Sequence, residues 1–245
     1  MPDLHTRAVH AGREDLTDLG VHALPLDLSS TSPFTDFDSA TASLDALVNG
    51  DASAPNPIYA RLHNPTVARF ETAFADLEEA DASVAFASGM AAMTAILLAA
   101  RADGNHVVAT RPIYGTTDHL LSCELLGFQV TWTTPDGVAQ AIRPDTALVI
   151  TETPANPTLD LVDLEAVVAQ AGDVPVVVDS TFATPVLQRP LTHGAALVLH
   201  SATKFIGGHG DVVAGVVACS EAWARRLRQI RLVTGAILHP LAGHL

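Results

Sequence analysis

The sequence predicts an α/β protein with a mostly parallel sheet that is covered by helices on both faces. Short apolar runs without polar alternation recur along most of the 245 residues, and segments of helical length separate them. Strands that read as continuous apolar runs are buried on both faces, as in parallel sheets packed between helices. Hydrophobic residues make up 48% of the chain, which is enough for a sizeable core.

The N-terminal quarter of the chain reads differently from the rest. Residues 1–60 are rich in Pro, Ser, Asp and Gly and show no core-forming periodicity, so we expect an irregular arm that packs on another surface, such as a partner subunit. A helix should follow, because Asn64 can cap it and Pro65 suits its first turn. Its apolar side chains share one face at helical spacing: Val67, Phe70, Phe74 and Leu77.

Beyond residue 80, apolar strands and helices alternate. The expected strands cover 83–86, 106–110, 128–132, 146–150, 174–179, 196–201 and 212–219. The expected helices cover 89–100, 114–126, 161–171 and 220–231. The uncharged stretch 82–100 has the length of a membrane span, but Ala, Ser and Gly interrupt it, so we interpret it as a strand, a tight turn and a helix.

Charge and cysteine content exclude several classes of partner. Acidic residues outnumber basic ones 27 to 13, and the formal charge of −14 disfavours nucleic acid and anionic membranes. Cys123 and Cys219 form no CxxC pair and no disulfide framework, which is typical of a reducing cytoplasm. The N-terminus is charged and lacks the apolar core of a signal peptide, so we expect a cytoplasmic location.

The chain contains a single lysine, Lys204, beside 12 arginines. Arginine can serve most surface positions that need a cation, but its guanidinium stays charged and cannot form a Schiff base. Lys204 is therefore a candidate for chemistry. A general depletion of lysine, with Lys204 as the residue that remains, is the alternative explanation.

Polar residues gather at the carboxyl ends of the predicted strands, where ligands of parallel sheets bind. The groups in chain order are Ser88-Gly89-Met90, Tyr114, Glu152 with Asn156, Asp179-Ser180-Thr181, and Ser201 to Lys204. Each one alone could be an ordinary turn or cap. Together they supply what pyridoxal 5'-phosphate (PLP) needs: a lysine, an acid for the ring nitrogen, a flat side chain and donors for a phosphate at a helix N-terminus.

Six motifs in order also carry a family resemblance over nearly the whole chain. They are YARLHNPT, FASGMAA, RPIYGTT, ETPANPT, VVVDSTFATP and SATKFIGGHGDVVAG. Together they are similar to the Cys/Met-metabolism PLP-dependent enzymes, the group of cystathionine γ-synthase, cystathionine γ-lyase and methionine γ-lyase. The resemblance implies the type I aminotransferase-like fold, in which 61–245 would be the PLP-binding large domain and 1–60 the arm.

The same resemblance implies a role for each matching residue. Lys204 corresponds to the lysine that binds PLP covalently, Asp179 to the partner of the ring nitrogen, and Tyr114 to the ring-stacking tyrosine. These three would be the catalytic residues. The other expected cofactor contacts are Ser88, Gly89, Met90, Asn156, Thr181, Ser201 and Thr203, together with Tyr59 and Arg61, which would reach the PLP phosphate of a neighbouring subunit.

The implied function is a carbon–sulfur lyase or a γ-replacement enzyme acting on an amino acid such as cystathionine, in a homodimer or homotetramer with shared active sites. Thr116 stands where methionine γ-lyases carry cysteine, which disfavours that activity. The family's smaller C-terminal domain, with its carboxylate-binding arginine, has no counterpart here. We therefore expect a partial or truncated chain, and the alternative function is an inactive remnant that binds only PLP or a partner subunit.

Other site classes lack their motifs. The run Gly207-Gly208-His209-Gly210 lacks the GxGxxG spacing of dinucleotide-binding turns, and the hydrolase motif GxSxG does not occur. HExxH does not occur either, and the 11 histidines lack the spacing of metal ligands, so we expect no metal site.

Overall fold

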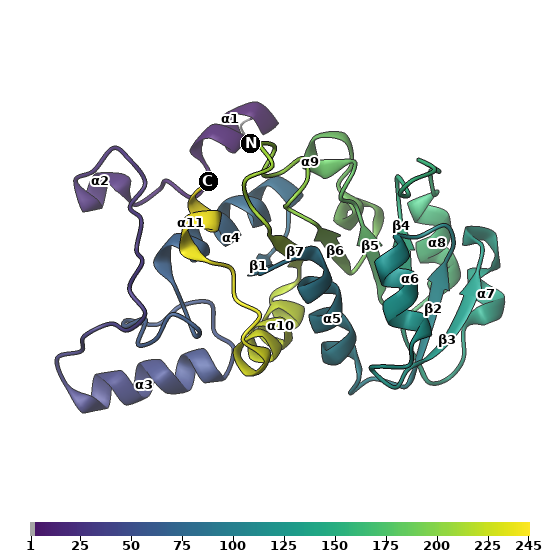
Figure 1. Ribbon diagram of the computed structural model, residues 1–245, viewed down its shortest axis with the longest axis horizontal. Coiled ribbons are helices and arrows are strands. Elements are labelled where there is room, and N and C mark those ends of the chain that lie inside the picture. Colours follow the sequence, from purple (N-terminus) through teal and green to yellow (C-terminus); the bar gives the residue numbers. More distant parts are fainter. Residues whose placement is uncertain (1–2) are drawn as a thin grey trace.

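The central feature of the protein is a seven-stranded sheet with the order β1-β7-β6-β5-β4-β2-β3, seen in a computed structural model that describes residues 3–245 (Figure 1). The strands are β1 (Ala82–Phe86), β2 (His106–Thr110), β3 (Gln129–Thr133), β4 (Thr146–Glu152), β5 (Val176–Asp179), β6 (Leu197–His200) and β7 (Gly215–Cys219). Pairing is parallel from β3 through β2, β4 and β5 to β6. Only β7 runs in the opposite direction to the other strands of this sheet, so the predicted mostly parallel α/β fold is confirmed.

The helices connect these strands and cover the sheet. Beyond the arm they are α4 (Pro65–Glu78), α5 (Gly89–Ala100), α6 (Gly115–Ser122), α7 (Val138–Ala141), α8 (Leu164–Ala171), α9 (Thr184–Leu187), α10 (Glu221–Thr234) and α11 (Pro240–His244). Short 3₁₀ turns lie at Pro135–Gly137 and Pro190–His193. The helix expected at 114–126 ends at Ser122, because Glu124, directly after the C-cap residue Cys123, adopts a left-handed backbone conformation at a φ of 55°.

Alternate residues of the strands pack into separate cores on the two faces of the sheet. On one face, Val107 and Ala109 of β2 lie in a large core with α5, α6 and α10. On the other face, Val108 packs with α7 and α8, and a third cluster joins β1 and β7 to α4. These two-sided cores explain why the strands read as continuous apolar runs.

The start of α4 forms as the sequence predicts. The Asn64 side chain accepts hydrogen bonds from the backbone amides of Thr66 (3.0 Å) and Val67 (3.1 Å), and Pro65 occupies the first turn. On the inner face, Val67 and Phe74 are buried against the sheet.

The uncharged stretch 82–100 folds as expected into β1, a turn and α5. All five residues of β1 are buried. Within residues 3–245, none of the helices is both long enough and apolar enough to cross a bilayer.

The arm contains more helix than its composition predicted. The helices are α1 (Leu4–His10), α2 (Leu16–Leu19) and α3 (Phe37–Val48). Asp36 caps α3 by accepting from the Ser39 amide. Phe37 is 78% exposed and only Ser43 and Leu47 of this helix are buried, so its apolar pattern is too weak to predict a helix. In Figure 1, α2 and α3 lie apart from the sheet, to the left of α4 and α10.

Candidate active site

A pocket of about 210 Å³ opens at the carboxyl ends of the parallel strands. Residues from the loops after β1, β2, β4, β5 and β6 line it. The lining includes ten of the expected site residues: Ser88, Gly89, Met90, Tyr114, Asn156, Asp179, Thr181, Ser201, Thr203 and Lys204. The structure therefore brings together side chains that lie more than a hundred residues apart in the sequence.

The N-terminus of α5 forms one wall of this pocket. Ser88 caps the helix by accepting from the Ala91 amide at 3.1 Å, which leaves the amides of Gly89 and Met90 at the pocket lining. A Cβ at Gly89 would lie 3.0 Å from the Ser201 Cβ, so only glycine lets the helix approach the Ser201 loop this closely. Backbone donors, the helix dipole and a nearby hydroxyl together suit a phosphate group.

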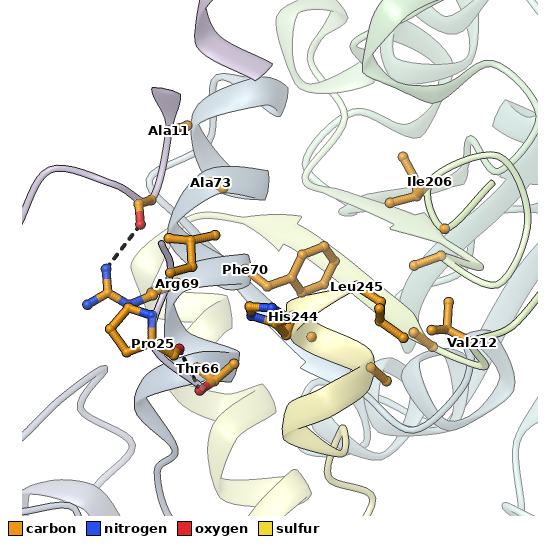
Figure 2. A pocket seen from close by; sticks show the side chains of 17 residues that line it. Ala11, Pro25, Thr66, Arg69, Phe70, Ala73, Ile206, Val212, His244 and Leu245 are labelled. Carbon is orange, nitrogen blue, oxygen red and sulfur yellow. Dashed lines mark hydrogen bonds between the residues drawn. The ribbon is translucent and has the colours of Figure 1, made fainter. Parts of the chain in front are cut away.

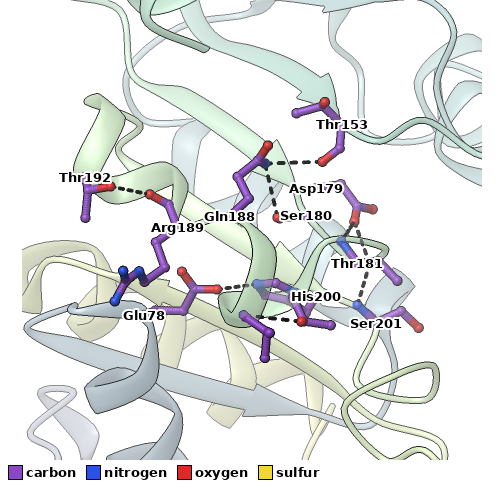
Figure 3. Close-up of polar contacts among 12 residues, drawn as sticks. Glu78, Thr153, Asp179, Ser180, Thr181, Gln188, Arg189, Thr192, His200 and Ser201 are labelled. Carbon is purple, nitrogen blue, oxygen red and sulfur yellow. Dashed lines mark hydrogen bonds and ion pairs between the residues drawn. The ribbon is translucent and has the colours of Figure 1, made fainter. Parts of the chain in front are cut away.

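A chain of hydrogen bonds links the ends of β5 and β6 (Figure 3). The Thr181 hydroxyl donates to Asp179 Oδ1 at 2.5 Å and accepts from the Ser201 amide at 2.8 Å. The Thr181 amide donates to the same Asp179 oxygen at 3.1 Å. Thr181 thereby fixes the carboxylate relative to the loop that carries Lys204.

Asp179 is a buried acid that faces the pocket without a basic partner among its hydrogen bonds. Burial raises the pKa of this carboxyl, and the bonds from Thr181 offset part of that effect. A cation bound in the pocket would complement the carboxylate and favour its ionised form. The protonated ring nitrogen of PLP is such a cation.

The loop after β6 carries Lys204, whose side chain is exposed toward the pocket. Its neighbour Thr203 donates its hydroxyl to the Ala214 carbonyl at 3.1 Å and accepts from the Ala214 amide at 3.0 Å. The Thr203 hydroxyl thus holds the loop against the segment before β7, and its expected role as a phosphate ligand stays a prediction.

Behind this loop, a buried contact between His200 and Glu78 anchors the last residue of β6. His200 Nε2 lies 2.6 Å from Glu78 Oε1, and both side chains are fully buried (Figure 3). The His200 ring also packs edge-on against Phe74, with centroids 5.2 Å apart. His200 is not among the residues that line the pocket, and its contacts with Glu78 and Phe74 give it a structural role.

Glu152 belongs to the pocket, although the sequence did not predict it as a catalytic or cofactor-binding residue. It ends β4, directly beside Asp179 in the strand register, and it lines the pocket. Its carboxylate accepts from the backbone amides of Tyr114 at 2.5 Å and Asn156 at 2.8 Å. The sequence placed it at a strand end, but the pairing of β4 with β5, which reveals its neighbour, was not visible there.

The raised pKa of Glu152 predicts that the stability of the folded protein depends on pH. Burial and then the nearby Asp179 charge raise the pKa of Glu152 to about 7 from 4.5. Because the folded state binds the proton of Glu152 more tightly, this group stabilises the fold fully below its pKa in the unfolded state. That contribution is lost as the pH rises through its pKa in the folded state. We expect the stability of Glu152→Gln relative to wild type to increase from about pH 5 to about pH 8.

Urea unfolding measures the difference in stability between Glu152→Gln and wild type. Both proteins must be free of cofactor, because a cation beside Asp179 would offset the effect of the Asp179 charge on Glu152. Glu124→Gln is the matched control, because Glu124 is exposed after α6 and its carboxylate makes no hydrogen bond or ion pair within residues 3–245. A Glu152→Gln difference that stays constant across this pH range would contradict the raised pKa.

Tyr59 and Arg61 are not among the residues that line this pocket. The Arg61 guanidinium lies over the Tyr59 ring, 5.3 Å from its centroid, and donates to the Leu232 carbonyl at 2.8 Å. Both residues are exposed. Their expected role at the site of a neighbouring subunit stays a prediction.

A second pocket lies between the arm, α4 and the C-terminal residues (Figure 2). Its lining is mainly apolar, with Phe70, Ile206 and Leu245 among its side chains. The only arginine in this lining, Arg69, is already paired with Asp15 at 2.5 Å. Of the two pockets, the one that contains Lys204 is therefore the candidate active site.

The residues of the Lys204 pocket fit PLP. They provide an amine, a buried acid, a tyrosine and an amide, with a helix N-terminus and Ser201 as donors for a phosphate. Lys204 would hold the aldehyde, Asp179 the ring nitrogen and the Ser88–Met90 turn the phosphate.

Comparison with known proteins agrees with this fit. The family model of the Cys/Met metabolism PLP-dependent enzymes matches residues 5–245. The chain is 62% identical to an L-methionine gamma-lyase of Streptomyces avermitilis over 244 residues, which are 99% of this chain and 59% of that protein. It is 43% identical to a cystathionine gamma-lyase of Bacillus subtilis over 190 residues, 74% of this chain and 50% of that protein.

Solved structures give the same result. A cystathionine gamma synthase from Xanthomonas oryzae pv. oryzae, in complex with cystathionine, superposes with a TM-score of 0.88 at 31% identity, over 100% of this chain and 62% of that one. The chain thus spans about 60% of the length of several of these proteins. By its family match and its relatives, this chain belongs to the Cys/Met metabolism PLP-dependent enzymes.

Proposed function

We propose that the protein is a PLP-dependent enzyme of sulfur amino-acid metabolism, a carbon–sulfur lyase or a γ-replacement enzyme. The observation that carries this proposal is the meeting of Lys204 and Asp179 in one pocket, with the anion-binding turn of α5 on its wall. Bound PLP supplies an electron sink for a substrate carbanion. Names of relatives, methionine and cystathionine γ-lyases among them, support this reaction class.

The chain's own residues have distinct tasks in this proposal. The Lys204 amine holds the cofactor and moves a proton to and from the substrate Cα, a task that arginine cannot perform. Asp179 keeps a negative charge at the ring nitrogen, and Thr181 fixes the direction of that carboxylate. Tyr114 stacks on the ring and, at 40% exposure, its hydroxyl can reach a leaving group in the open pocket.

The substrate class is an amino acid with sulfur at the γ position. Thr116 disfavours methionine γ-lyase activity, whereas the relative with 62% identity is a methionine γ-lyase, so both methionine and cystathionine belong in the test. We propose a visible absorption spectrum after addition of PLP, followed by a keto-acid assay with cystathionine, methionine, homocysteine and cysteine. Keto acid from any of them supports the proposal. A cofactor spectrum without keto acid would instead indicate the inactive, cofactor-binding remnant.

We also propose that each active site is completed by a second copy of the chain. Apolar side chains of the arm remain exposed, among them Leu28 at 61% and Phe37 at 78%. Surfaces of this kind are typical of subunit contacts. Tyr59 and Arg61 follow this segment, exposed and outside their own pocket, where a guanidinium can reach a neighbour's phosphate.

Mixing two inactive variants should restore activity. Arg61→Ala and Lys204→Ala should each be inactive, but a mixed dimer has one site with both defects and one site with neither. Half of the dimers from an equal mixture are mixed, so activity should return to roughly a quarter of wild type. The measurement is keto-acid production by the unfractionated, co-expressed mixture, in which two affinity tags demonstrate the mixed dimers.

The matched control places both substitutions in one chain and mixes it with wild type. If sites are shared, both sites of a mixed dimer are defective, and only the wild-type dimers work, roughly a quarter of the population. If each chain uses its own Arg61, roughly half of the activity remains. That second outcome, with no recovery in the first mixture, would place Arg61 in its own subunit.

A further inference from the structure

Glu152 occupies an unusual position for an acid in this site. It is the last residue of β4, only 5% exposed, and no basic side chain contacts its carboxylate in the described chain. Instead, its two oxygens accept from two backbone amides: Oε2 from Tyr114 at 2.5 Å and Oε1 from Asn156 at 2.8 Å. Tyr114 and Asn156 are both expected cofactor contacts, and both line the pocket.

The two amides belong to different loops of the sheet. Tyr114 precedes α6 in the loop after β2, whereas Asn156 lies in the loop after β4. Tyr114 makes no side-chain cap for α6, so the bond to Glu152 is what ties the start of this helix to β4. A single carboxylate therefore sets the position of one loop relative to the other.

We propose that Glu152 is a positioning residue: it clamps Tyr114 and Asn156 on either side of its carboxylate so that their side chains face the cofactor in one fixed arrangement. This inference rests on the proposed function, because it assumes that PLP occupies the pocket. Glu152 itself takes no part in proton transfer in this account, since both of its oxygens are engaged by amides.

Glu152→Gln is the informative substitution, because glutamine has nearly the same shape but only one oxygen. One of the two amides then faces an NH₂ group and loses its acceptor. We expect Lys204 to be labelled by PLP and borohydride as fully as in wild type, while the visible circular dichroism of the bound cofactor falls by at least about half. Misplacement of the Tyr114 ring relative to the cofactor should lower kcat/KM by about 10- to 100-fold, mainly through kcat.

Glu165→Gln is the control, since Glu165 is 76% exposed on α8 and should leave all three readouts unchanged. If wild type neither binds PLP nor is labelled, the proposed function fails. If wild type binds PLP but Glu152→Gln matches it in circular dichroism and kinetics, the clamp alone is overturned.

A measurement on the wild-type holoenzyme covers the case in which Glu152→Gln does not fold. The Tyr114 amide should exchange its hydrogen slowly because Glu152 accepts it, whereas the amide of Gly115, at the first position of α6, has no intrahelical acceptor. Exchange at least about tenfold slower at Tyr114 than at Gly115 supports the clamp. Equal rates at the two amides would overturn it.

Discussion

Replacement of Lys204 by arginine is expected to lower turnover by at least about 10³-fold. Arginine keeps the positive charge and much of the length of the side chain, but it can neither bond covalently to an aldehyde nor accept a proton at neutral pH. Because Lys204 is the single lysine of the chain, no other side-chain amine can replace it from a neighbouring position. The measurement is keto-acid production from methionine and cystathionine.

Arg226→Lys is the control for this experiment. Arg226 lies on α10 and pairs with Asp103, outside the residues that line the pocket, and its replacement conserves the charge. It should leave turnover within about twofold of wild type. Lys204→Arg turnover within tenfold of wild type would show that Lys204 is not the group that moves the proton.

The second large effect is expected at Asp179. Asparagine can still accept the bonds from Thr181, so the geometry of the site should persist, but the negative charge beside the ring nitrogen is lost. We expect turnover to fall by about 10²-fold, about 2.7 kcal/mol in the barrier, while PLP still binds. Because burial raises the pKa of Asp179, removal of its charge should not destabilise the empty protein.

Asp173→Asn provides the matched control, since Asp173 is exposed just before β5. It should change neither turnover nor stability. Asp179→Asn turnover within about threefold of wild type, less than 1 kcal/mol in the barrier, would refute the role of the charge.

Helices and strands could be predicted where the sequence contains a cap, a turn residue or an apolar pattern. Asn64 and Pro65 marked the start of α4, and the stretch 82–100 carried its own turn at Ser88. Helix α3 was not predicted because only two of its residues, Ser43 and Leu47, are buried, while Phe37 and Val48 face solvent in the single chain. Its cap, Asp36, was the one local signal available.

The spatial arrangement of the helices and strands was harder to predict from the sequence than the helices and strands themselves. The antiparallel β7 reads like its parallel neighbours, because all of its residues are buried. Strand ends correctly indicated where the site lies, since parallel strands place their carboxyl ends at one edge. The clamp by Glu152 could not be predicted, because it depends on the β4–β5 register and on two backbone amides that carry no side-chain signal.

The covalent site of the cofactor is the most direct test of this account. Incubation with PLP, reduction with borohydride, digestion and mass spectrometry locate the pyridoxyl group on the chain. We predict a single labelled peptide, with the label on Lys204. A label elsewhere, for example at the N-terminal amine, or no label while the cofactor is demonstrably bound, would contradict the central role of Lys204.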